Sequence, residues 1–267
     1  MHEAVTLEIV SETEVKKGRD LGIQLDYRAI DAAPEHFVEA LMDFAETGGS
    51  GANITLPLKE LAAGLCAELS DGAARAGAVN TLIALPGGRW RGDNTDGIGL
   101  IADLQRLGVA VSDRRLLVLG AGGSVRGILS GLLAARPATL QIANRTQERA
   151  QQLAAEFAPL GPIGAIARNQ IDGAFDLVIH ATSAYRVPLP GELPRAAFAP
   201  QTIAYDLSYG DAAAGFIAAV RAIGVRAAHD GLGMLIEQAA EAFERWHGVH
   251  PETAPVHQEL RASMSAP

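Results

Sequence analysis

Residues 114–135 read RRLLVLGAGGSVRGILSGLLAA, a pattern typical of a short apolar strand, a glycine turn and an amphipathic helix. Leu116–Leu119 form an uninterrupted apolar run, as expected for a parallel strand that is buried on both faces. Pro137 marks a break, after which ATLQIANRT (138–146) predicts a second strand ending in a polar turn. A strand, a helix and a strand within about 30 residues indicate a βαβ unit.

The same alternation continues toward the C-terminus. FDLVIHATS (175–183) and TIAYDLSYG (202–210) predict strands, and a helix over 212–223 separates the second from VRAAHDG (225–231). Strands that alternate with helices favour a parallel sheet covered by helices. GMLIEQAAEAFERWHG (233–248) predicts a last helix, which ends at Gly248.

The chain before residue 97 has a different pattern. Strand-like segments at 22–31, 51–57 and 78–85 alternate with predicted helices at 34–47 and 59–69. Pro86, Gly87 and Gly88 predict a hairpin turn that leads into a strand over 89–92. We therefore predict an α/β protein with two α/β domains and a cleft between them. The first domain would span 1–96, completed by a C-terminal helix over 231–267, and the second would span 97–230.

Composition and charge limit the classes of function. The 267 residues are 48% hydrophobic and 20% charged, which is ordinary for a folded globular protein. Lys and Arg number 22 against 31 Asp and Glu, and the net charge of −9 argues against nucleic acid or a membrane surface as a partner. No apolar stretch reaches the roughly 18–20 residues that span a bilayer. Cys66 is the single cysteine, which suits the reducing cytoplasm that we expect.

The glycine turn after the first buried strand favours a cofactor site. Glycines there let the backbone approach a pyrophosphate, which the free N–H groups at the start of the next helix can bind. The fingerprint is incomplete, because Val125 stands in place of its third glycine. A turn that only packs helix against strand is the alternative. The candidate residues are Gly120, Ala121, Gly122, Gly123 and Ser124.

The end of the second strand indicates which nicotinamide cofactor would bind. An NAD enzyme commonly has Asp or Glu there for the ribose 2′-hydroxyl. This chain has Asn144, Arg145 and Thr146 instead, with Arg149 one turn later. Guanidinium and hydroxyl groups suit a 2′-phosphate, which a carboxylate would repel, so the pattern favours NADP. The alternative is that both arginines are solvated charges at a helix end.

Three segments before residue 97 carry polar residues at strand ends and loops, where functional sites are commonly built. They are GANITLPLK (51–59), AGAVNT (76–81) and GDNTDG (92–97). A lysine beside an aspartate can pass a proton to a carbonyl oxygen while a hydride reaches its carbon. Thr55 and Asn80 could then orient the hydroxyls of a substrate.

At these residues the chain resembles the shikimate dehydrogenase family. The similar stretches, in the family's order and spacing, are GANITLPLKE, AGAVNTL, GDNTDGIG, VLGAGGSVRG, ANRT, YDLSYG and DGLGMLIEQAAEAFERWHG. The resemblance implies a substrate domain over 1–96 and a Rossmann-like NADP-binding domain over 97–230. It also implies the reversible NADPH-linked reduction of 3-dehydroshikimate to shikimate, in chorismate and aromatic amino acid biosynthesis.

The resemblance implies roles for single residues as well. Lys59 and Asp96 would form the acid–base pair, and Thr55, Asn80, Tyr209 and Gln238 would contact the substrate. The cofactor would be lined by Gly120, Ala121, Gly122, Gly123, Ser124, Asn144, Arg145, Thr146, Arg149, Leu207 and Gly231. Taken singly, each residue also has an ordinary alternative, such as a solvated charge, a turn, a helix cap or an exposed helix position. No metal-ligand spacing is present, and a homodimer remains open.

The first 20 residues, MHEAVTLEIVSETEVKKGRD, depart from the family. The family has a Gly-Asn-Pro turn and a His-Ser-x-Ser-Pro segment there, whose two hydroxyls hold the substrate carboxylate. Ser11 and Thr13 have that spacing, but acidic neighbours would repel an anion. A reading-frame error, genuine divergence or a different start would each produce this segment. The family also usually has asparagine in place of His180 and glycine in place of Tyr185.

These departures leave two alternatives to a shikimate dehydrogenase. The first is a quinate/shikimate dehydrogenase-like relative that prefers quinate and NAD, against which Arg145 argues. The second is a catalytically impaired relative that binds nucleotide but has lost part of its substrate site. Retention of Lys59 and Asp96 argues against lost chemistry, and the missing serine motif argues for it.

Overall fold

The computed structural model describes residues 6–7, 26–55, 57–182 and 193–264, and the chain divides into two compact units. The N-terminal unit comprises Met1–Gly99 and Ile236–Pro267, and the central unit comprises Leu100–Leu235. The α/β fold class predicted from the sequence is confirmed, including a parallel sheet. No helix in the described part of the chain combines the length and the apolar character that crossing a bilayer requires.

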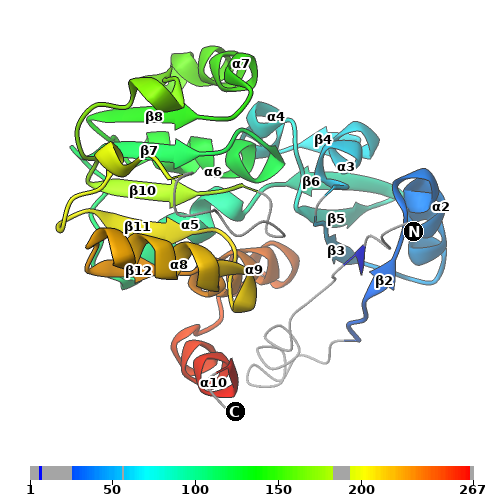
Figure 1. Ribbon diagram of the computed structural model, residues 1–267. Helices are drawn as coiled ribbons and strands as arrows, with labels where there is room; N and C mark the ends of the chain where they lie inside the picture. Colours follow the sequence, from blue (N-terminus) through cyan, green and yellow to red (C-terminus); the bar gives the residue numbers. More distant parts are fainter. Residues whose placement is uncertain (1–5, 8–25, 56, 183–192, 265–267) are drawn as a thin grey trace. The chain divides into compact units, whose positions relative to one another are not determined.

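The central unit is built on a six-stranded parallel sheet in the order β12-β11-β10-β7-β8-β9 (Figure 1). Counted from β7, this is the 3-2-1-4-5-6 order of dinucleotide-binding sheets, in which the strand order reverses between β7 and β10. The strands are β7 (Arg115–Leu119), β8 (Thr139–Ala143), β9 (Ile163–Ala165), β10 (Leu177–His180), β11 (Ile203–Asp206) and β12 (Ala227–His229).

Alternating residues of the central strands enter two separate cores. Leu116 and Val118 of β7 pack with helices α5, α6 and α7, whereas Leu117 and Leu119 pack with α8. This is the burial on both faces that the apolar run predicts. The helices are α5 (Asp96–Arg106), α6 (Gly123–Ala134), α7 (Gln147–Phe157) and α8 (Asp211–Ile223), with 3-10 turns at Ala158–Leu160, Arg168–Gln170 and Arg195–Ala197.

The N-terminal unit contains a four-stranded sheet in the order β3-β5-β6-β4. The predicted hairpin is confirmed, because β5 and β6 pair antiparallel across the turn at Pro86–Gly88. The strands are β1 (Thr6–Leu7), β2 (Ile30–Asp31), β3 (Gly51–Asn53), β4 (Glu68–Leu69), β5 (Thr81–Leu85) and β6 (Arg89–Asp93). The helices are a 3-10 turn at Pro34–His36, α2 (Phe37–Glu46), α3 (Lys59–Leu65), α4 (Asp71–Ala76), most of α9 (Leu232–His247) and α10 (Ala254–Met264).

The helix predicted over 59–69 is wrong in its second half. Helix α3 ends at Leu65, and Glu68–Leu69 form β4, which pairs parallel with β6. The N–H of Ala67 donates to the carbonyl of Trp90 at 2.8 Å, so the sheet takes the backbone groups that a longer helix would have used. Both residues of β4 are exposed, so no hydrophobic alternation marks this strand in the sequence.

Candidate functional site

Lys59 and Asp96 form an ion pair in the N-terminal unit. Lys59 is the first residue of α3 and Asp96 the first of α5, and Lys59 Nζ lies 2.5 Å from Asp96 Oδ2. The two side chains are only 12% and 6% exposed. Charge-assisted hydrogen bonds are short and directional, and partial exclusion of water strengthens them. The pair is therefore held in one geometry, as proton transfer between fixed groups requires.

Asn80 holds the second carboxylate oxygen of Asp96. Its side-chain nitrogen Nδ2 lies 2.9 Å from Asp96 Oδ1, 2.9 Å from Thr95 Oγ1 and 3.0 Å from Gln238 Oε1. Its side-chain oxygen Oδ1 accepts the backbone N–H of Thr95 at 2.9 Å and the hydroxyl of Thr81 at 2.8 Å. Because Asn80 is buried and uses both ends of its amide, it fixes the orientation of the Asp96 carboxylate.

Gln238 joins this network from α9, and Gly99 makes the approach of the helix possible. A Cβ atom added at Gly99 would lie 2.5 Å from the backbone nitrogen of Gln238, closer than a real side chain tolerates. The hydroxyl of Thr95 also donates to the backbone carbonyl of Gln238 at 3.0 Å. A glycine in α5 thus allows the close helix contact that brings Gln238 to Asn80.

Asp93 supports the loop that carries Asp96. Its Oδ1 accepts the Ser70 hydroxyl at 2.5 Å and the backbone N–H of Asn94 at 2.7 Å, and its Oδ2 accepts Arg245 Nε–H at 2.9 Å. Burial raises the pKa of Asp93, but the hydrogen bonds from Ser70, Arg245 and Asn94 outweigh it and hold that pKa below its ordinary value. The side chain of Asn94 accepts the backbone N–H of Asp96 at 3.1 Å, which links Arg245 to the candidate catalytic carboxylate.

The other two predicted substrate residues lie in different units. Thr55 is half-buried just after β3, and its carbonyl accepts the N–H of Leu58 at 2.9 Å. Its side chain does not cap α3, whose N-cap residue is Leu58, so the helix-cap alternative for Thr55 is wrong. Tyr209 lies just before α8 in the central unit and is 39% exposed. Among the described residues, the hydrogen-bond network itself joins Lys59, Asp96, Asn80 and Gln238 and does not include Thr55.

A cavity of about 320 Å³ lies in the central unit at the carboxyl ends of β7, β8 and β10. This is the position where the strand order reverses, and sheets of this order bind ligands there. Arg145, Arg149 and Arg168 line the cavity, and its described lining residues include no Asp or Glu. In a chain whose net charge is −9, this local excess of cations is complementary to an anion.

Most of the predicted cofactor residues line this cavity. They are Gly120, Ala121, Gly122, Asn144, Arg145, Thr146 and Arg149. Gly123 and Ser124 form the start of α6 and are not among the lining residues. Leu207 and Gly231 also lie outside the lining but contact one another, since a Cβ atom at Gly231 would lie 2.3 Å from the carbonyl oxygen of Leu207.

Glycine occupies two positions of the turn, Gly120 and Gly122, for different structural reasons. Gly120 has a φ of +131°, and a Cβ atom there would lie 2.6 Å from the carbonyl oxygen of Ala181. The fold itself therefore requires a glycine at this position. Gly122 has an ordinary φ of −102°, and no atom lies within 4 Å of the place of its missing Cβ. Its absent side chain leaves open space at the cavity wall, where a ligand can approach the backbone.

Sequence reasoning missed three charged or polar residues of the cavity, Arg168, His180 and Thr182. Arg168 follows β9, a strand that the sequence pattern did not predict, so its position could not be inferred. His180 ends β10, is 5% exposed and has its Nδ1 3.0 Å from Asp206 Oδ2. Its ring stacks on Phe216 with ring centroids 4.5 Å apart. The one available signal was that histidine replaces the asparagine usual in the family.

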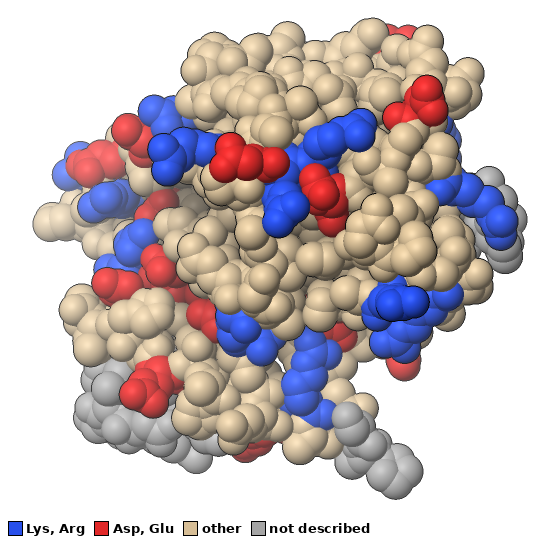
Figure 2. All heavy atoms as spheres, turned by 90° about the vertical axis from the view of Figure 1, so that its left-hand side faces the viewer, with Lys and Arg blue, Asp and Glu red and all other residues tan. Residues whose placement is uncertain are grey.

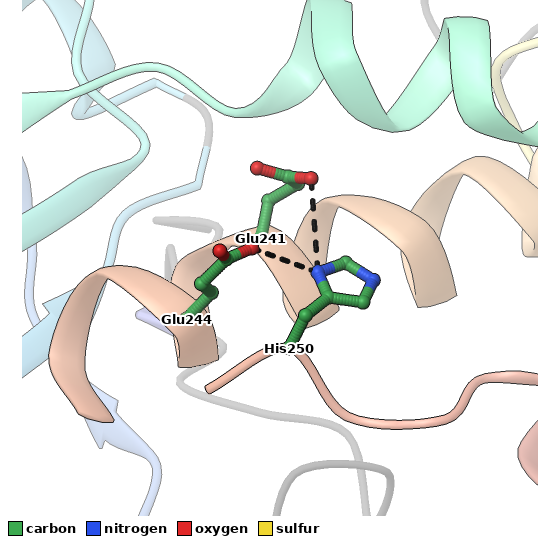
Figure 3. A group of neighbouring side chains, drawn as sticks. All are labelled: Glu241, Glu244 and His250. Atoms are coloured by element: carbon green, nitrogen blue, oxygen red, sulfur yellow. Dashed lines mark hydrogen bonds and ion pairs between the residues drawn. The ribbon is translucent and has the colours of Figure 1, made fainter. Parts of the chain in front are cut away.

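Glu241, Glu244 and His250 form a group that could hold a metal ion (Figure 3). The ring of His250 is turned toward both glutamates, with Nδ1 2.9 Å from Glu244 Oε2 and 3.9 Å from Glu241 Oε1. Arg245 Nη2 also lies 3.3 Å from Glu241 Oε2. These ion pairs account for the cluster, and the absence of a metal from the function stays a prediction.

The surface drawn in Figure 2 shows basic side chains lying among acidic ones. Non-specific nucleic-acid binding requires a basic patch or stripe on one face. Among the described residues, the face in this view has no continuous basic surface. The expectation that nucleic acid is not a partner stays a prediction.

Family models match most of the chain. The model described as "Shikimate dehydrogenase substrate binding domain" matches residues 12–82, and "Shikimate / quinate 5-dehydrogenase" matches residues 103–206. The model described as "Shikimate 5'-dehydrogenase C-terminal domain" matches residues 231–261. The first and third matches fall in the N-terminal unit except for residues 231–235, and the second falls in the central unit.

Individual proteins show the same similarity over nearly the whole length. Shikimate dehydrogenase (NADP(+)) of Xanthomonas campestris pv. campestris strain 8004 is 49% identical over 253 residues, which cover 92% of this chain and 88% of the relative. The crystal structure of an Ael1 enzyme from Pseudomonas putida has a TM-score of 0.86 at 37% identity, covering 93% of this chain and 92% of that one. Shikimate 5-dehydrogenase from Thermus thermophilus, in complex with NADP(H) and shikimate, has a TM-score of 0.82 at 32% identity, covering 94% and 93%.

Proposed function

The chain belongs to the shikimate dehydrogenase family and is an NADP-dependent oxidoreductase acting on a CH–OH group, and we propose that Lys59 and Asp96 are its catalytic pair. Its reaction is the reversible NADPH-linked reduction of 3-dehydroshikimate to shikimate. The observation that carries the assignment of the pair is its geometry. Lys59 Nζ and Asp96 Oδ2 are 2.5 Å apart, and Asn80 fixes the other carboxylate oxygen.

The pair supplies the proton transfer of the reaction. In the direction of reduction, the ammonium group of Lys59 donates a proton to the carbonyl oxygen of the substrate. In oxidation, the neutral amine of Lys59 accepts the proton of the substrate hydroxyl. Asp96 orients Nζ and balances its charge through the hydrogen bond at 2.5 Å. NADP(H), when bound, supplies or takes the hydride. The N-terminal unit is therefore the proposed substrate-binding unit, and the central unit the proposed cofactor-binding unit.

Thr55, Asn80, Tyr209 and Gln238 remain the proposed substrate contacts. Asn80 has two N–H groups and already lies within 3.0 Å of three acceptors, Asp96, Thr95 and Gln238. A substrate hydroxyl at Asn80 would thus share an N–H with this network or displace one partner. We assign Asn80 two roles for this reason: it orients the carboxylate of Asp96 and it contacts the substrate.

The chemistry of the cavity in the central unit fits NADP(H). Arg145, Thr146 and Arg149, with Asn144, are proposed to hold the 2′-phosphate, because guanidinium groups form bidentate bonds to phosphates. The turn Gly120–Gly122 and the start of α6 at Gly123 and Ser124 are proposed to hold the pyrophosphate on backbone N–H groups. The open space beside Gly122 supports this assignment. Leu207 and Gly231 are proposed to contact the rest of the cofactor.

Steady-state oxidation of shikimate with NADP, followed by the absorbance of the reduced nicotinamide, tests the function. We expect faster turnover with shikimate than with quinate, and with NADP than with NAD. Higher kcat/KM for quinate and NAD would instead support the relative that prefers quinate. The relatives at 48–49% identity are named shikimate dehydrogenase (NADP(+)), which does not favour that alternative.

The impaired nucleotide-binding relative is tested by binding rather than by turnover. It rests on residues 1–20, which lie outside the described residues apart from Thr6 and Leu7, as does Tyr185. Calorimetric titration of shikimate and of NADP into the full chain separates the two sites. Weak shikimate binding beside ordinary NADP binding, rescued by grafting a Gly-Asn-Pro and His-Ser-x-Ser-Pro segment over residues 1–20, would support impairment. Tight shikimate binding by the unmodified chain would contradict it.

A further inference from the structure

Three polar side chains form a hydrogen-bonded row at the wall of the cavity. Asp206 Oδ2 lies 3.0 Å from Nδ1 of His180, and Nε2 of His180 lies 2.5 Å from Oγ1 of Thr182. We call this row the His180 relay. His180 and Thr182 both line the cavity, whereas Asp206 is buried behind them. The relay thus leads from a buried carboxylate to a hydroxyl at the surface of the cavity.

The surroundings of His180 hold its ring in place. The ring lies nearly parallel to that of Phe216, with an interplanar angle of 6° and centroids 4.5 Å apart. The second oxygen of Asp206 accepts the backbone N–H of Ser208 at 2.9 Å, so the carboxylate itself is fixed. The carbonyl of His180 also accepts the N–H of Leu207 at 2.9 Å. Because the ring is held by these neighbours, it presents Nε2 to Thr182 in one orientation.

The order of donors along the relay follows from the chemistry of its ends. Asp206 is a buried acceptor, so the ring proton of a neutral His180 belongs on Nδ1. Nε2 then has only a lone pair, and the hydroxyl of Thr182 donates its hydrogen to it. The oxygen of Thr182 is left with lone pairs, which suit a ligand hydroxyl and not a phosphate oxygen. The relay therefore sets both the position and the polarity of this hydroxyl.

The place of the relay in the sheet indicates which part of a dinucleotide it meets. Sheets of this order consist of two mononucleotide-binding halves, which meet where the strand order reverses. Arg145 follows β8 in one half, and His180 ends β10 in the other. If Arg145 holds the 2′-phosphate of the adenosine half, Thr182 faces the nicotinamide half.

We propose that His180 is a cofactor-positioning residue that acts through Thr182. It holds the Thr182 oxygen where that oxygen accepts a hydrogen bond from a ribose hydroxyl in the nicotinamide half of NADP(H). This role rests on the proposed function of the cavity as the NADP(H) site. Asparagine at this position would place its amide near Nδ1 of the ring and satisfy Asp206, but it would end short of Thr182. Relative to asparagine, histidine therefore adds the contact to Thr182.

Two substitutions and two ligands test this role in the full chain. Thr182→Val removes the hydroxyl and keeps the shape, and His180→Asn keeps a partner for Asp206 but loses the contact to Thr182. The dissociation constants of NADP and of adenosine 2′,5′-bisphosphate, which contains only the adenosine half, are measured by calorimetry. Each variant should raise the dissociation constant of NADP about three- to tenfold, which is the range of one net hydrogen bond. The dissociation constant of the bisphosphate should change by less than about twofold, because its contacts lie on the other half of the sheet.

The double variant tests whether His180 acts through Thr182. If His180 acts only by positioning the Thr182 hydroxyl, replacing His180 has no further effect once that hydroxyl has been removed. The double variant Thr182→Val with His180→Asn should therefore bind NADP no more weakly than the single variant that has the higher dissociation constant. Thr146→Val is the matched control at the N-cap position of α7, and it should weaken the binding of both ligands or of neither. The thermal midpoint of each variant without ligand shows that it is folded.

Three results would overturn the proposal. They are unchanged NADP binding by Thr182→Val, multiplication of the two single effects in the double variant, and equal weakening of the bisphosphate. Thr182 is exposed, so its valine variant tests the proposal even if His180→Asn does not fold. A parent chain that binds neither NADP nor the bisphosphate would instead show that the proposed cofactor site is wrong.

Discussion

The Lys59–Asp96 pair and the cavity of the central unit differ in the signs of the charges that they bring together. In the pair, both carboxylate oxygens of Asp96 already have donors, from Lys59 and from Asn80. In the cavity, three arginines line the wall with no carboxylate among the described lining residues. Groups that perform chemistry gain from being held in place before the ligand arrives. A binding cavity instead presents the charge that its ligand neutralises.

The two regions also differ in how far apart their residues lie in the sequence. Residues 120–122 of the cavity lie between β7 and α6, and its residues Asn144, Arg145, Thr146 and Arg149 follow β8, so their positions follow from a local pattern. The network around Asp96 combines residues from α3, α5 and α9 with Asn80, which directly precedes β5. A substitution in the cavity should therefore alter the binding of one ligand. A substitution in the network should instead alter the turnover number or the free energy of unfolding.

The largest effect should come from removing the acid–base group of the proposed pair. Lys59→Ala is expected to lower the turnover number of shikimate oxidation by about a hundredfold or more, the scale of a lost acid–base group. The dissociation constant of NADP should hardly change, because the cofactor cavity lies in the central unit. Steady-state kinetics and calorimetry measure the two quantities. Glu60→Gln, the exposed next residue, is the control and should keep turnover. Survival of turnover with only a raised KM for shikimate would make Lys59 a binding residue.

The next largest effect should distinguish a glycine that the fold requires from a glycine that ligand binding requires, within one turn. Gly120→Ala is expected to lower the free energy of unfolding by about 2–3 kcal/mol, because of its positive φ and the nearby carbonyl of Ala181. Gly122→Ala should change it by less than about 1 kcal/mol, since the space is open and the φ is ordinary. The methyl group that Gly122→Ala introduces should instead weaken the binding of NADP. Urea unfolding and NADP titration of both variants provide the measurement. Equal loss of stability would refute the distinction.

A charge reversal in the cavity should affect one cofactor selectively. Arg145→Asp is expected to raise the KM for NADP about tenfold or more, because it replaces a charge-assisted contact with a repelling carboxylate. Turnover with NAD should suffer far less, since NAD has no 2′-phosphate. Arg226→Asp, an exposed position before β12, is the control. An equal rise in KM for both cofactors would exclude Arg145 from the 2′-phosphate site.

The smallest effect should appear in the support of the Asp96 loop. Arg245→Met is expected to lower the free energy of unfolding by about 1 kcal/mol at pH 7, because it removes one partner of Asp93. The pKa of Asp93 is held below its ordinary 3.8, so its stabilisation is complete above that pH. It is lost as the pH falls through the lowered pKa of the folded state.

The stability difference between Arg245→Met and the parent should therefore shrink in strong acid. Urea unfolding at pH 7 and at the lowest pH where the parent remains folded measures this difference. Arg226→Met controls for the loss of one positive charge. A difference that stays constant between the two pH values would mean that Arg245 contributes packing and not charge.

The fold of the central unit could be predicted because its information is local. A buried strand, the turn at Gly120–Gly122 and a helix follow one another within residues 114–135, and the structure confirms this order as β7 and α6. The failure at Glu68–Leu69 has the opposite cause. That strand is short and exposed, and it exists because β6 offers backbone partners from a distant segment.

By itself, the sequence determined the α/β class, the parallel sheet with its glycine turn, and the motifs that mark the family. Periodicity and spacing carry this information, since each strand or turn depends on near neighbours. Only the tertiary structure decided which groups meet, such as Asn80 with Gln238, Arg245 with Asp93, and His180 with Asp206 and Thr182. Most of these contacts join side chains from separate elements, and buried polar groups must find such partners when the elements pack.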